Sequence, residues 1–217
     1  MPNQSGRVYG LTILSPIIDD PNADVSHDCA IRNFLATVPR DLHSPFAALS
    51  STHICRLVVM DDVIYVGTPA REEHLQSKYL VFESNFDGDL DTYLTWMAKQ
   101  IPDLVESVWS HCVGYPGVRD PAAFAAYMKK CQIETTFYFA DVNNHTVQST
   151  LRALKVQASV AEFIARHQGK SATELQQAFR KFFERMRNMP TPEPGSPNPA
   201  GAHQSVPLNK SIAAHHG

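Results

Sequence analysis

The chain has 217 residues, of which 43% are hydrophobic and 19% are charged, with a net charge of −3 and a pI near 6.3. This length fits one folded domain with room for appended helices or a tail. A slightly acidic chain lacks the positive charge that binds polyanions, so no nucleic-acid partner is expected. Its apolar runs are shorter than the ~18 residues of a bilayer crossing, so no membrane span is expected.

The four cysteines are scattered, without a C-x-x-C pair. We expect reduced thiols that act as small apolar side chains, because a domain of this size does not depend on disulfides. The first residues lack the charged and then apolar pattern of a signal peptide, which predicts a cytoplasmic protein. The spacing of a calcium loop and the H-E-x-x-H pair are both missing, so no metal site is predicted.

Apolar periodicity divides the chain into strands and helices. Runs of β-branched and aromatic residues predict four strands, at residues 8–17, 52–60, 79–86 and 133–142. Apolar residues at three- and four-residue steps predict helices at residues 21–38, 90–112, 121–131, 146–167 and 173–189. Pro102 is expected to kink or split the second helix, because it removes a backbone donor and clashes with the preceding turn.

The stretch from Lys78 to Asp89 organises this pattern. Its strand alternates, with Leu80, Phe82, Ser84 and Phe86 on one face and the other face formed by Tyr79, Val81, Glu83 and Asn85. Asp87 and Gly88 then predict a tight turn, and an aspartate there is expected to cap the next helix.

We expect one α+β domain over residues 1–189, with its core at 8–142 and two helices appended at 146–189. The last helix has an apolar face that is expected to cover the domain: Leu175, Phe179, Phe182, Phe183 and Met186. Residues 190–217 are rich in Pro, Gly, Ser and Ala, and are predicted to be disordered because they have too little apolar surface to offset ordering.

The order of elements is strand, helix, strand, strand, helix, strand, and it resembles the ferredoxin-like (βαββαβ) fold with a four-stranded antiparallel sheet. Among such proteins the chain is most similar to the dimeric α+β barrels, which include small monooxygenases, haem-degrading enzymes and haem-dependent peroxidases. The resemblance implies a homodimer with facing sheets, and it makes haem a candidate cofactor. It covers residues 8–142 and rests on element order, so it transfers no functional residue.

Arg56 is the most unusual residue of the second predicted strand, because burying a guanidinium without a partner is costly. It binds either an anionic ligand or Glu83 on the neighbouring strand. His53 lies three residues before Arg56, so the two face opposite sides unless the strand bulges. Both are candidate catalytic residues.

Asn85 and Asp87 end the central strand beside a helix N-terminus, where they and Glu83 are candidate ligand-binding residues. The simpler interpretation is local, with Asp87 or Asp89 capping the helix. Both interpretations stay open.

His111, Cys112 and Tyr115 place an imidazole, a thiol and a phenol within five residues. Adjacent helical residues point about 100° apart, so Cys112 is assigned to the core rather than to a His–Cys pair. His111 remains a candidate catalytic residue or haem ligand, and Tyr115 a candidate ligand-binding residue.

Two functions follow from these features. The first is binding of a small apolar ligand, or an oxidoreductase-like reaction, at the open sheet face, with haem as a candidate cofactor. The second is a non-catalytic interaction domain that docks a partner protein through the sheet face and the basic last helix, where Arg180, Lys181, Arg185 and Arg187 lie.

Overall fold

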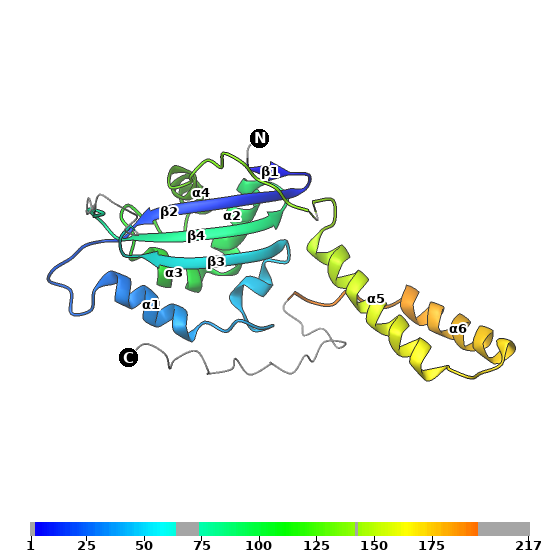
Figure 1. Cartoon of the computed structure of the whole chain (residues 1–217). Helices are drawn as coiled ribbons and strands as arrows, with labels where there is room; N and C mark the ends of the chain where they lie inside the picture. The colour runs from blue at the N-terminus through cyan, green and yellow to red at the C-terminus, as the bar shows by residue number, and fades with distance from the viewer. Residues whose placement is uncertain (1–2, 64–73, 142, 195–217) are drawn as a thin grey trace, which may run out of the picture.

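The computed structural model describes residues 3–63, 74–141 and 143–194, and it is an α+β structure built on one antiparallel sheet (Figure 1). Its strands are β1 (Gln4–Ser5), β2 (Val8–Pro16), β3 (Thr52–Met60) and β4 (Tyr79–Asp87). They lie in the order β1-β2-β4-β3, and all neighbours are antiparallel. The predicted α+β class and antiparallel sheet are therefore confirmed.

Helices cover one face of this sheet and leave the other open. The helices are α1 (His27–Thr37), the short 3-10 helix η1 (Pro45–Ala48), α2 (Leu90–Gln100), α3 (Pro102–Trp109), α4 (Pro121–Lys130), α5 (Val147–Arg166) and α6 (Ala172–Arg187). Figure 1 shows α2, α3 and α4 behind the sheet, and α1 beside the β3 edge. The helices α5 and α6 form a hairpin that projects away from the rest.

Alternation along β4 buries one of the two faces expected from the sequence and builds the core. The buried residues are Leu80, Phe82, Ser84 and Phe86. Phe82 meets Trp109 edge-on at a centroid distance of 5.4 Å, and Phe86 stacks on Tyr93 at 3.7 Å. Ser84 Oγ lies 2.8 Å from the Tyr93 hydroxyl, so the one polar side chain on this face is hydrogen-bonded.

The turn after β4 also forms as predicted. Gly88 adopts a φ of +102°, a conformation that glycine tolerates and larger residues avoid. Asp89 caps α2 by accepting the Thr92 backbone N–H at 2.9 Å. The long helix predicted after this turn is split into α2 and α3 at Pro102, where Ile101 leaves the helical conformation.

The strand predicted at 133–142 is wrong for the described residues 133–141, which form no strand. Gln132 makes one isolated bridge with Ile13, and the chain then leaves the edge of β2. The start of the same β2 edge is occupied by β1, in which Ser5 pairs with Val8. Among the described residues the fourth strand of the ferredoxin-like order is therefore not formed, and β1 holds the edge position instead.

The segment 133–141, called the strap below, crosses the outer face of the sheet, which is the face turned away from α2, α3 and α4. Tyr138 anchors it, since its hydroxyl donates to Asn85 Oδ1 at 2.8 Å. Its ring lies over Gly10, where an added Cβ would come within 2.6 Å. Beyond the strap, Asn143 O accepts the Arg7 backbone N–H at 2.8 Å.

The structure confirms the predicted C-terminal helices but describes only the first residues of the predicted tail. The helices predicted at 146–167 and 173–189 are present as α5 and α6. The tail predicted from residue 190 lies outside the described residues from 195 onward.

Gly10→Ala is expected to lower the free energy of unfolding by about 1–2 kcal/mol, because the methyl group would displace Tyr138 and break its bond to Asn85. In a Tyr138→Ala background the same change should be neutral or slightly stabilising, because alanine loses less backbone entropy than glycine. Urea unfolding of the four proteins measures this cycle. An equal loss of unfolding free energy from Gly10→Ala in both backgrounds would contradict the packing of Tyr138 on Gly10.

Candidate functional site

The outer face carries the charged pair considered in the sequence. Arg56 and Glu83 lie directly opposite each other in the β3–β4 register, and Arg56 Nε donates to Glu83 Oε2. The hydrogen bond and the charge of Glu83 raise the pKa of Arg56. The Arg56 side chain is 71% exposed, so it is a solvated surface pair. Of the two interpretations of Arg56, an anionic ligand or a pair with Glu83, the structure shows the ion pair with Glu83.

A β-bulge decides the direction of His53. The β3–β4 register shifts between Thr52 and Ile54, and His53 is the extra residue. Its Nε2 lies 2.9 Å from Asp87 Oδ1. The other oxygen of Asp87 accepts the backbone N–H of Val147, the first residue of α5, at 2.9 Å. Asp87 therefore connects the end of the sheet to the start of the hairpin, whereas the sequence suggested either a ligand-binding role or a cap of the adjacent helix.

Each polar ligand candidate on β4 has a partner from another part of the chain. Glu83 binds Arg56, Asn85 accepts from Tyr138, and Asp87 binds His53 as well as α5. These side chains therefore stabilise the sheet, the strap and the hairpin junction. Ligand binding at this face stays a prediction.

His111 lies elsewhere, beside the N-terminus of α1. Its Nδ1 is 2.8 Å from Nδ1 of His27, so one ring donates and the other accepts. Burial, followed by the charge of His27, lowers the pKa of His111. The pair connects α1 to the turn after α3, and sequence reasoning did not connect these positions because 84 residues separate them.

The neighbours of His111 belong to the core. Cys112 is buried, and burial raises the pKa of its thiol to about 12, as expected for an unreactive cysteine. Tyr115 meets Phe124 and Tyr127 edge-on, and burial raises its pKa. Tyr115 therefore lies on the helical side of the sheet and is not brought together with Arg56 or His53.

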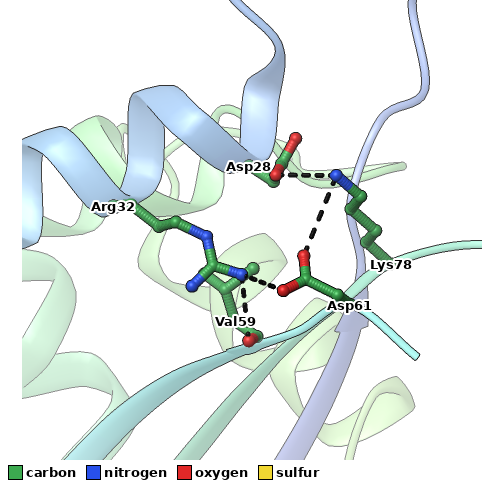
Figure 2. Close-up of polar contacts among 5 residues, drawn as sticks. All are labelled: Asp28, Arg32, Val59, Asp61 and Lys78. Carbon is green, nitrogen blue, oxygen red and sulfur yellow. Dashed lines mark hydrogen bonds and ion pairs between the residues drawn. The ribbon is translucent and has the colours of Figure 1, made fainter. Parts of the chain in front are cut away.

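A charged cleft, missed by sequence reasoning, lies between α1 and the ends of β3 and β4 (Figure 2). Lys78 Nζ donates to Asp28 at 2.8 Å and lies 3.8 Å from Asp61. Arg32 contacts Asp61 at 2.5 Å and the carbonyl of Val59 at 3.4 Å. The hydrogen bond from Lys78 lowers the pKa of Asp28, which in turn raises that of Lys78.

The space beside these residues is a cavity of about 270 Å³, lined also by His27. Lys78 and Arg32 pair with Asp28 and Asp61, and this network holds α1 against the sheet. Asp19 and Asp20 also line the cavity. The only sequence signal was a charged residue at each strand end, Asp61 after β3 and Lys78 before β4. In the described parts of the chain, no three His, Cys, Asp or Glu side chains are grouped so that they could hold a metal ion.

The largest departure from the sequence expectation is the hairpin. The apolar face of α6 was predicted to cover the domain, yet Phe179 and Phe183 are 51% and 55% exposed. Only Phe182 of α6 is buried, and it packs on Phe163 of α5 at 4.7 Å. The prediction is wrong because α6 folds back on α5, which itself points away from the sheet (Figure 1).

The tip of the hairpin is hollowed. Phe163 and Ile164 of α5 face Leu175 and Phe179 of α6 across a groove of about 590 Å³, called the hairpin-tip groove below. Lys170 also lines it, so an apolar floor is joined to a positive rim. A surface of this kind is suited to an apolar side chain with acidic neighbours.

Comparison of the chain with protein-family models, with curated protein sequences and with solved structures finds no match in any of the three. No described helix combines the length and the apolar character that crossing a membrane requires. Functional interpretation therefore depends on the surfaces and contacts given above.

The stability of the protein is expected to fall as the pH is lowered from about 7.5 to 5.5. The folded state lowers the pKa of His111, so the unfolded chain binds more protons in this range and is favoured. The loss should level off once the pH is below the folded pKa. Urea unfolding at several pH values measures it. His111→Gln should show a smaller decrease, and an equal decrease would contradict this role for the pair.

Asp87→Ala is expected to speed amide exchange at Val147 about fivefold, because losing a helix-capping bond costs about 1 kcal/mol. Hydrogen exchange followed by NMR measures this. Asp89→Ala is the matched control, since it removes the cap of α2 and should speed exchange at Thr92 while leaving Val147 unchanged. Unchanged exchange at Val147 in Asp87→Ala would rule out the carboxylate as the anchor of α5.

Proposed function

We propose that this protein is a non-catalytic interaction domain that docks a partner protein through the α5–α6 hairpin. The observation that carries the proposal is a set of apolar side chains that are between 37% and 55% exposed on the two helices: Leu154, Val160, Ile164, Leu175, Phe179 and Phe183. Exposed apolar residues are common singly, but Ile164, Leu175 and Phe179 line one groove, and such a grouping is typical of a binding surface.

The spacing on α6 supports the same function. Leu175, Phe179 and Phe183 follow one another at four-residue steps, which is the pattern of a helix face that packs against something. Within the hairpin this face meets α5 only in part, because Phe182 takes the central position. A docked partner would supply the burial that the rest of the described chain does not.

Binding of a small apolar ligand, with haem as a candidate cofactor, was the first expectation from the sequence. It is less well supported, because Arg56 and His53 bind Glu83 and Asp87, while His111 binds His27. The outer sheet face instead presents Ile54 and Val58, which are 63% and 47% exposed. That surface is also better suited to a protein than to a polar ligand.

A photo-crosslinking residue placed at Phe179 tests the docking function in cells that make the protein. We expect an adduct from position 179, which lies in the hairpin-tip groove, and little or none from Lys181, which points about 200° around α6. Adducts are detected as heavier species on a denaturing gel and identified by mass spectrometry. A folded protein that yields no adduct at 179, or equal adducts at both positions, would contradict docking through the hairpin.

A further inference from the structure

The strap holds two of the most exposed aromatic side chains of the described chain. Phe137 and Phe139 are 82% and 70% exposed. They flank Tyr138, which is bound to Asn85 and packed on Gly10. Neighbouring side chains of an extended segment point to opposite sides, so anchoring Tyr138 turns both phenylalanines toward solvent. The strap therefore presents two exposed aromatic rings, on either side of an anchored residue, on the outer face of the sheet.

The hairpin-tip groove has the complementary chemistry. It is an apolar hollow of about 590 Å³ that includes Ile164, Leu175 and Phe179. This volume lies within the ~300–1,000 Å³ that is usual for binding clefts.

Charge is divided between the same two surfaces. The hairpin, residues 147–187, has eight Lys or Arg and three Glu, whereas residues 1–146 have eighteen Asp or Glu and ten Lys or Arg. Locally, the strap carries Glu134 and Asp141 and no basic residue, and the hairpin tip carries Lys170, Glu174 and an Arg166 that pairs with Glu162. The net positive charge of the whole hairpin would attract the acidic strap of another copy, whereas two hairpins would repel each other.

We propose that the strap of one copy docks into the hairpin-tip groove of a second copy, with Phe137 and Phe139 inserted beside Ile164 and Phe179. The contact is made twice around a two-fold axis and gives a closed dimer. This inference rests on the proposed docking function of the hairpin and names its partner.

The geometry requires a second copy. α5 has 20 residues and is therefore about 30 Å long, and its first residue is bound to Asp87 at the end of the sheet. The strap ends at Asp141, just before this helix starts, so a straight α5 holds the hairpin tip far from the strap of its own chain (Figure 1). A strap from another molecule has no such restriction.

The area is that of a weak pair. A phenylalanine buries about 150–250 Å², so the two rings of each strap, repeated by symmetry, bury on the order of 600–1,000 Å². This lies below the ~1,200 Å² of stable interfaces, so the dimer is expected to form with rising concentration.

Sedimentation velocity of the full chain between micromolar and hundred-micromolar concentration tests the dimer. We expect the wild type to sediment increasingly as a dimer as its concentration rises, and both Phe137→Ser/Phe139→Ser and Ile164→Ser/Phe179→Ser to sediment as monomers. Ile54→Ser/Val58→Ser is the matched control, because these residues are also exposed and apolar but lie outside the contact. Circular dichroism checks that each variant is folded.

Mixing the strap variant with the groove variant sharpens the test. Such a pair retains one intact contact, because one partner supplies the strap and the other the groove. A mixed dimer, weaker than the wild type but formed by two proteins that are each monomeric alone, is the expected result. A wild type that stays monomeric would overturn the inference. So would a dimer that the strap variant leaves intact, or one that the control disrupts.

The photo-crosslinker at Phe179 in the purified protein separates this inference from the proposed function. An adduct of twice the 24.1 kDa chain, joined to a strap peptide, supports the dimer. An intramolecular link, or in cells an adduct with a different protein only, overturns it, and the second result leaves the docking function standing. If no adduct forms in the purified protein or in cells, both the dimer and the docking function are contradicted.

Discussion

Burial of one face of β4 is the constraint on which the rest of this structure depends. Its apolar side chains pack on Trp109 and Tyr93 from α3 and α2, and this contact holds the helices to one side of the sheet. The alternation of the strand then turns Glu83, Asn85 and Asp87 to the other side. The same strand therefore sets both the core and the polar contacts of the outer face.

Those polar contacts position the surfaces proposed to bind a partner. Asn85 holds the strap through Tyr138, and Asp87 holds the start of α5 while also binding His53. Residues that look like an active site in the sequence thus fix two projecting elements in defined places. An exposed apolar group on a fixed element loses less entropy on binding than one on a free segment, which suits it to docking.

The division of charge gives the two surfaces different roles. A basic hairpin and an acidic body attract between molecules, and salt is expected to weaken that attraction. The charged cleft at Lys78 does not take part in this attraction between molecules, because Asp28 and Asp61 are bound to Lys78 within the cleft. Its network instead holds α1 in place.

The sequence by itself determined the local elements: the alternating strands, the amphipathic helices, the break at Pro102 and the cap at Asp89. These depend on neighbouring residues and on fixed periods of two and 3.6. Only the tertiary structure decided that β1 takes the sheet edge, that His27 meets His111, and that α6 leaves Phe179 exposed. Each outcome is a competition between segments distant in the chain, and periodicity records that a face is apolar without recording what covers it.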